Sequence, residues 1–404
     1  FLGLTARVGF DRLVVGHRLT HATAAWQAAA AMANLAPRND VSRIFPMPVR
    51  IDLSAVQFGE KEKPLAEAAG FTLSTFRYDS GIAAMRVRNR RGEIIVLPFK
   101  GHQIWRCIFD GRDLTMKSMF DEPVPDVPYL ETYGAFFIHC GATAIGAPGP
   151  TDRHPLHGEL PNAPYQKGWV VLDEQKGTCA IVGTYEYTVA FSYHYLATST
   201  HVMGADSTLL DISLSVENLK KTPMDLMYLA HANFRPVDNG ELFYSAPATA
   251  EAVRVRKSIP AHITPTAAYK DFLEKLAADP KLHHVLKPGL AFDPEVAMTI
   301  DMTAGPDGFA HALLRRPDGS SDYMRYRPEQ CGQCIRWICR TPDQDAIGVA
   351  FPSTSEVEGH TAEKKKGLYV NLGGGETWRV DMRVGTLDAE DTARVAREIA
   401  AING

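Results

Sequence analysis

The chain has 404 residues, of which 45% are hydrophobic and 22% charged, with a formal net charge of −4 at pH 7. This is the composition of an ordinary globular protein. The charge balance lacks the excess of basic residues that a nucleic-acid-binding surface needs, and no apolar run is long enough to cross a bilayer. We therefore expect neither a nucleic-acid nor a membrane partner.

The first 45 residues differ in pattern from the rest. An alanine-rich stretch over 19–35, ended by Pro37, predicts a helix in an N-terminal accessory segment, residues 1–45. The sequence starts with Phe1, which we interpret as a processed end without a secretory signal. The six cysteines mostly lie far apart, as expected for reduced thiols, and this favours a cytoplasmic setting.

From residue 46 onward the chain reads as one large β domain, residues 46–404. Short apolar or alternating runs recur about every ten residues between turn signals, which is typical of an antiparallel sandwich. The runs lie at 81–88, 93–98, 103–108, 168–172, 179–183, 185–191, 208–216, 223–230, 295–302, 310–314, 335–340, 346–351 and 378–384. Helices are predicted at 267–278 and 388–401. The expected fold class is therefore all-β, a large antiparallel β-sandwich with a few accessory helices.

Two segments carry residues suited to acid–base chemistry. In the first, His154, His157 and Glu159 follow a Gly/Pro-rich stretch. If this piece is extended, His157 and Glu159 share one face, because side chains alternate along a strand. The alternative is that one histidine caps a turn and Glu159 is a solvated surface charge.

The second segment ends an apolar strand. His231 and Asn233 are two residues apart and again share a face, and Arg235 follows next to a proline. The alternative interpretation is a histidine at a strand end whose ring is satisfied by backbone hydrogen bonds.

In order and spacing, these segments resemble the galactose mutarotase (aldose 1-epimerase) superfamily, and within it a divergent bacterial branch of aldose 1-epimerase family proteins. Further matching segments are 101–104, 215–218, 238–241, Trp337, 346–350 and 373–377. The resemblance covers about residues 50–385 and implies a galactose mutarotase-like supersandwich. It also implies a free monosaccharide or sugar derivative as substrate and no cofactor. We expect a homodimer, although no motif specifies the oligomeric state.

In that family two histidines and a glutamate interconvert sugar anomers: a base removes the anomeric proton while an acid protonates the ring oxygen. The resemblance makes His231 the acid and His157 the residue that orients the anomeric oxygen. The implied substrate-binding residues are His102, Gln103, His139, Asn233, Arg235, Trp337 and Glu356.

The chain departs from the family pattern at the base. Phe351 stands where the family glutamate is expected, so no carboxylate occupies that position. Glu159 is the best available replacement, which makes His157, His231 and Glu159 the predicted catalytic set. The missing glutamate also leaves open a catalytically silent sugar-binding module.

A metal-dependent reaction is the second enzymatic alternative. His154, His157, Glu159 and His231 together suit one divalent metal ion with open positions for sugar oxygens. Such a site would support isomerisation of a sugar or β-elimination from a keto sugar.

Two other segments have simpler interpretations. His283 and His284 lie in a polar stretch and are expected at the surface. The charge run from Glu363 to Lys366 is expected to be a solvated turn.

Overall fold

The computed structural model describes residues 47–259, 264–290 and 292–404. The predicted helix at 19–35 lies outside these residues. Between Pro46 and the C-terminus the chain forms one unit. None of the described helices is long and apolar enough to cross a membrane.

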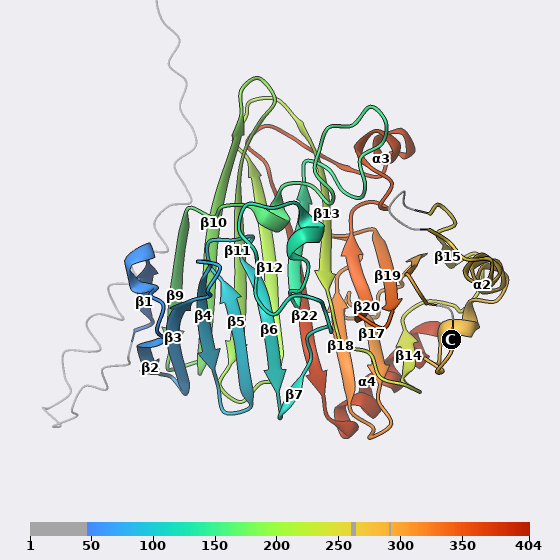
Figure 1. Cartoon of the computed structure of the whole chain (residues 1–404), viewed down its shortest axis with the longest axis horizontal. Helices are drawn as coiled ribbons and strands as arrows, with labels where there is room; N and C mark the ends of the chain where they lie inside the picture. The colour runs from blue at the N-terminus through green and yellow to red at the C-terminus, as the bar shows by residue number, and fades with distance from the viewer. Residues whose placement is uncertain (1–46, 260–263, 291) are drawn as a thin grey trace, which may run out of the picture. The chain divides into compact units, whose positions relative to one another are not determined.

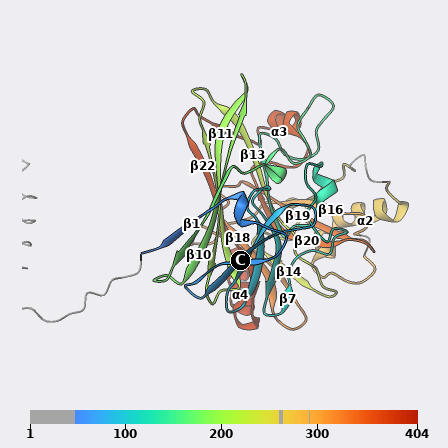
Figure 2. The same ribbon diagram turned by 60° about the vertical axis from the view of Figure 1, so that its left-hand side comes forward.

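Two antiparallel sheets form this unit and confirm the expected all-β sandwich (Figures 1 and 2). In spatial order, the nine-stranded sheet consists of β1 (Val49–Leu53), β9 (Lys167–Asp173), β10 (Thr178–Val189), β11 (Tyr193–Gly204), β12 (Leu209–Asn218), β22 (Thr377–Leu387), β18 (Ser321–Tyr326), β17 (Ala310–Arg315) and β14 (Glu241–Tyr244).

The thirteen-stranded sheet packs against it. In order it contains β15 (Val253–Val255), β16 (Val296–Ile300), β19 (Gln333–Arg340), β20 (Asp345–Ser353), β13 (Met224–Ala232), β8 (Phe137–Ala142), β6 (Gln103–Phe109), β5 (Gly92–Leu97), β4 (Ala83–Arg88), β3 (Phe71–Arg77) and β2 (Lys63–Ala68). Two short strands add to it, β21 (Val370–Leu372) on β13 and β7 (Arg112–Asp113) on β6.

Helices occupy the margins of the sandwich. They are α2 (Ala267–Ala278), α3 (His360–Lys366) and α4 (Ala389–Asn403), with short 3₁₀ turns η1 (Ala55–Gln57), η2 (Tyr129–Thr132), η3 (Leu160–Asn162) and η4 (Pro280–His283). The prediction of α2 is confirmed at both ends. Asp388 caps α4, because its side chain accepts the backbone N–H of Asp391 at 2.9 Å.

The core between the sheets follows from period-two alternation. In β11 the inward residues are Tyr195, Ala197, Ser199, His201 and Met203, and all are buried, while their neighbours are partly exposed. The two sheets meet directly, as where the rings of Tyr228 and Trp378 lie 5.1 Å apart. Polar residues on the inner faces are therefore enclosed together with the apolar core.

The six cysteines are buried, and none forms a disulfide. His283 corrects a prediction: it is fully buried rather than at the surface, and its Nε2 accepts a hydrogen bond of 2.8 Å from Arg336. Burial also lowers its pKa well below the usual value, so the imidazole stays neutral and can accept from the guanidinium.

Candidate active site

A small cavity of about 130 Å³ lies against the thirteen-stranded sheet. It lies on the face turned away from the other sheet, because Leu229 and His231 line it, whereas Tyr228, which precedes Leu229 in β13, contacts Trp378 of β22. Its walls come from η2, the loop before η3, and strands β13, β16, β19 and β20. The lining residues are Tyr129, Leu130, Tyr133, Gly146, Ala147, Leu156, His157, Leu229, His231, Arg256, Glu295, Ala297, Ile335, Trp337, Phe351 and Val357.

His231 has one determined tautomer. The amide nitrogen of Asn233 donates to the carbonyl of Ala135 at 2.9 Å, so the amide oxygen must face His231. That oxygen lies 2.6 Å from His231 Nδ1, which therefore carries the proton and donates it. Among the described residues, Nε2 has no hydrogen-bond partner. Because burial lowers the pKa of His231 well below its usual value, Nε2 is a free proton acceptor at neutral pH.

Asn233 is itself held from a second side. The hydroxyl of Tyr133, a cavity-lining residue, donates to the Asn233 amide oxygen at 2.9 Å. Asn233 is fully buried and does not line the cavity. The sequence predicted it to bind substrate, whereas the structure places it behind His231, where it orients the imidazole.

His157 reaches the same cavity from a tight turn. Its φ of 60° and that of Gly158, 76°, are both left-handed, and the turn closes with a hydrogen bond of 3.0 Å from Gly158 N to Pro155 O. The His157 ring lies edge-on to His231 at 5.8 Å between centroids. Burial, reinforced by the charge of Arg256, lowers the pKa of His157 to about 4. Two neutral imidazoles therefore face each other.

Glu295 is the one carboxylate among the described residues that line this cavity. It comes from the residue before β16, and its Oε2 accepts the indole N–H of Trp337 at 2.7 Å. The Trp337 ring also packs against His231 at 5.6 Å, so a single indole contacts both groups. Sequence reasoning missed Glu295, because it belongs to a strand two places away from β20 in the sheet.

Phe351 lies in the cavity wall, where the resemblance placed it. Its ring is 4.1 Å from that of His231, closer than any other ring contact of this histidine among the described residues. The apolar ring excludes water from this side of the imidazole, and no carboxylate stands there. This contact is one source of the desolvation that keeps His231 neutral.

Glu159 does not line the cavity, so the predicted shared face with His157 is wrong. The chain turns at His157 and enters η3 at Leu160 instead of running as a strand. The carboxylate accepts hydrogen bonds from Thr143 Oγ1 and Tyr195 OH, both at 2.6 Å, and from the backbone N–H of Ala142 at 3.1 Å. Burial raises its pKa. These hydrogen bonds to the Glu159 carboxylate fix the end of β8.

Three other predicted sugar ligands lie inside the sandwich and not in the cavity. His102 Nδ1 and His139 Nε2 lie 2.9 and 3.0 Å from the hydroxyl of Ser199 on the opposite sheet. Gln103 donates to the carbonyl of Pro161 at 2.7 Å. Period-two alternation along β8 points His139 toward the other sheet, whereas His102 lies in the turn before β6 with a left-handed φ of 47° and Gln103 bonds to η3. Arg235 is exposed and also lies outside the cavity lining.

The four predicted metal ligands are not brought together. His154 lies in the loop beside Asp152 and α3, where its Nε2 accepts from the backbone N–H of His360 at 3.4 Å. Glu159 faces β8, whereas His157 and His231 face the cavity. Within residues 47–259, 264–290 and 292–404, no three His, Cys, Asp or Glu side chains are placed to hold a metal ion.

The comparisons with known proteins assign the family. The model of a family described as a domain of unknown function, DUF4432, matches residues 79–386, three quarters of the chain. The chain belongs to the DUF4432 family. No curated protein matches it.

Solved structures show the fold of this DUF4432 protein. A "putative aldose 1-epimerase" from Klebsiella pneumoniae is similar, with a TM-score of 0.73, 17% identity, and coverage of 89% of this chain and 96% of that one. A galactose mutarotase-like protein from Clostridium acetobutylicum has a TM-score of 0.52 at 12% identity, covering 78% and 98% of the two chains. The recognised galactose mutarotase-like fold is confirmed.

Of the ten residues predicted for catalysis or substrate binding, three line the cavity of the DUF4432 protein, His157, His231 and Trp337. Glu356 lines a neighbouring hollow. The residues missed by sequence reasoning are Glu295, Arg256, Tyr129 and Tyr133. The one available signal for Glu295 was its position at the start of a predicted strand, which does not distinguish it from other strand-end carboxylates.

Proposed function

We propose that this protein is an enzyme of the aldose 1-epimerase type, which interconverts the anomers of a sugar by proton transfer. The observation that carries the proposal is the His231 imidazole: its tautomer is determined by Asn233, and its free Nε2 belongs to a cavity that also holds His157 and Glu295. The mutarotase-like fold supports the substrate class.

In the proposed reaction, His231 Nε2 takes the proton from the anomeric hydroxyl as the bond between C1 and the ring oxygen breaks. The same imidazole then returns the proton to the ring oxygen, which gives the open-chain aldehyde. Rotation about the C1–C2 bond and the reverse steps form the other anomer. Protons balance without an outside donor, and His231 acts first as base and then as acid.

Two neighbours support this proton transfer. The carboxylate of Glu295, held by the Trp337 indole, offers negative charge to the cavity in which the imidazolium forms. The Asn233 oxygen accepts the Nδ1 proton and keeps the ring from turning over. His157 lies beside His231, with the rings edge-on at 5.8 Å between centroids, and in this proposal it orients the sugar oxygen.

The test is anomer exchange measured by NMR on freshly dissolved α- and β-anomers of a panel of aldoses. We expect acceleration over the buffer rate with at least one sugar, and a loss of about 10²-fold or more in kcat for His231→Gln. His194→Gln is the control, because this histidine is exposed and pairs with Glu186. The proposal fails if no sugar shows acceleration, or if His231→Gln retains full activity.

A further inference from the structure

A second hollow of about 320 Å³ adjoins the cavity and shares Arg256, Ala297, Ile335 and Val357 with it. Its charged lining residues are four basic ones, Arg254, Arg256, Lys257 and Lys366, against Glu356 and Glu358. Acidic partners of these cations, such as Asp301 and Glu274, lie outside the lining. Each of the four cations is ion-paired, so the hollow has no overall positive charge, and Arg256 is the group that it offers at the boundary with the cavity. The pairs are Arg254 with Asp301, Lys257 with Glu274, Arg256 with Glu358, and Lys366 with Glu356 and Glu363.

Arg256 stands where the two spaces meet, and one edge of its guanidinium is engaged. Its Nε donates to Glu358 Oε1 at 2.7 Å and its Nη2 to Oε2 at 3.3 Å, and Ser258 Oγ lies 2.9 Å from Nε. Nη1 has no partner within the described parts of the chain. The fork to Glu358 orients the guanidinium and leaves Nη1 for a ligand.

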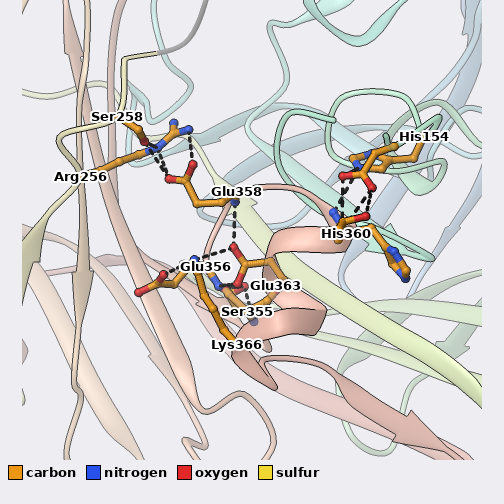
Figure 3. A network of polar contacts seen from close by, with 12 residues as sticks. His154, Arg256, Ser258, Ser355, Glu356, Glu358, His360, Glu363 and Lys366 are labelled. Carbon is orange, nitrogen blue, oxygen red and sulfur yellow. Dashed lines mark hydrogen bonds and ion pairs between the residues drawn. The ribbon is translucent and has the colours of Figure 1, made fainter. Parts of the chain in front are cut away.

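The support behind Arg256 is built from buried groups (Figure 3). Glu363 of α3 is fully buried, and its two carboxylate oxygens accept the backbone N–H groups of Glu358 at 2.9 Å and Glu356 at 3.1 Å. Lys366 pairs with Glu356 at 2.6 Å. The expected solvated turn at 363–366 is therefore wrong: this run is helical, and it holds the loop that carries Glu358.

The space on the other side of the cavity is acidic. A hollow of about 660 Å³ shares Leu130, Tyr133, Glu295 and Trp337 with the cavity. Its charged lining residues are Asp293, Glu295 and Asp343, with no basic residue among the described residues that line it. An anionic substituent is repelled there and attracted toward Arg256.

The central cavity, about 130 Å³, is smaller than the roughly 300 Å³ at which ligand pockets usually begin. A substrate that places its reactive carbon beside His231 must therefore extend into one of the adjoining hollows. We propose that the substrate is an anionic sugar, whose carboxylate or phosphate group is bound by Arg256 Nη1 in the hollow that this arginine lines, while the ring lies against His231. The position of the sugar ring against His231 rests on the proposed function, whereas the binding of an anionic group by Arg256 does not.

The test compares neutral and anionic sugars of the same ring. Binding by calorimetry and anomer exchange by NMR are measured for glucose and galactose, their uronates and their 6-phosphates. We expect anionic sugars to bind at least tenfold more tightly than neutral ones, with affinity falling as salt rises. The uronate and phosphate arms identify which anion is accepted.

Arg256→Gln should reduce the anionic-to-neutral affinity ratio at least tenfold, and Arg256→Lys, which keeps the charge but not the fork, should reduce it less. Arg91→Gln is the matched control, because Arg91 makes a similar fork to Asp110 far from the cavity in sequence and strand position. Urea unfolding verifies that each variant is folded.

Two results would overturn the inference: equal affinity for neutral and anionic sugars, or an unchanged affinity ratio in folded Arg256→Gln. If anionic sugars bind through Arg256 but no sugar shows anomer exchange, the proposed function fails and the anion site stands.

Discussion

At the scale of single residues, the chemistry depends on how neighbours set the state of His231. Asn233 determines which nitrogen carries the proton, and the contact with Phe351 helps to keep the ring neutral by desolvation. In the proposed reaction, His231 acts as a base before it takes the predicted acid role, and Glu295 is proposed to supply the carboxylate that Phe351 cannot.

The first residue-scale prediction concerns Glu295. Glu295→Gln keeps the shape of the side chain and its contact with Trp337 but removes the negative charge, so we expect kcat for anomer exchange to fall about 10²-fold. Glu131→Gln in η2 is the control, because Glu131 is exposed and does not line the cavity. Unchanged kcat in Glu295→Gln would show that this carboxylate does not act in the reaction.

The second residue-scale prediction is a pH profile. Burial lowers the pKa of His157 to about 4 and that of His231 well below its usual value of 6.5. His231 stops accepting a proton only when its ring is protonated, so kcat/KM should stay level as pH falls through 6.5 and decline only at lower pH, where His157, with a pKa of about 4, is also protonated. A decline centred at or above pH 6.5 would contradict the neutral, desolvated imidazole.

At the scale of elements, the turn before η3 points the side chains of His157 and Glu159 in different directions. Two successive left-handed residues reverse the chain at this turn, so one side chain enters the cavity and the other holds the end of β8. The hydrogen bond of 2.9 Å from Gly141 N to His157 O joins the turn to β8.

Gly158→Ala tests that turn. A Cβ at Gly158 would lie 2.5 Å from the carbonyl oxygens of both Ala144 and Gly141, besides the cost of a left-handed φ. Gly111→Ala is the matched control: its φ is 73°, but a Cβ there meets no atom within 4 Å. We expect Gly111→Ala to lower the free energy of unfolding by about 1–2 kcal/mol in urea titrations, and Gly158→Ala to lower it further and to reduce kcat. Equal losses in stability would show that the backbone contacts are not limiting.

At the scale of the whole molecule, the sandwich encloses an unusual set of neutral imidazoles. Among the described residues, eight histidines have lowered pKa values because burial disfavours their charged form: His102, His139, His157, His201, His231, His283, His284 and His311. The pKa is about 3 for His102 and His139. At pH values between the folded and unfolded pKa, the folded protein therefore binds fewer protons at these histidines than the unfolded chain does.

This linkage predicts acid sensitivity. As pH falls below the unfolded pKa of about 6.5, the unfolded chain gains protons before the folded one, so the free energy of unfolding falls. Each such histidine contributes up to about 1.4 kcal/mol per pH unit, down to its folded pKa. Buried Glu159, Glu363 and Asp322, with raised pKa values, act in the opposite direction but are fewer.

Urea titrations at pH 7.5, 6, 5 and 4.5 measure this effect. We expect a stability plateau above pH 7 and a progressive fall in the unfolding midpoint below pH 6.5. A midpoint that is constant or rises on acidification would refute the prediction.

Local patterns in the sequence were sufficient for the fold class, and the resemblance supplied the specific fold. Alternation in segments such as 103–108 and the helical pattern at 388–401 predict elements from contacts within a few residues, and these elements recur in the structure. The order of motifs also placed His157, His231 and Phe351 correctly in one cavity.

Only the tertiary structure decided which polar groups meet. The face presented by Glu159 depends on a left-handed turn, and His102, in the turn before β6, and His139, in β8, meet at the hydroxyl of Ser199 on the other sheet. Glu295 and Arg256 join the cavity because strand order in a sheet brings distant segments together. Alternation along a strand is a local property of the backbone, whereas the partners of a side chain are set by which strands lie side by side.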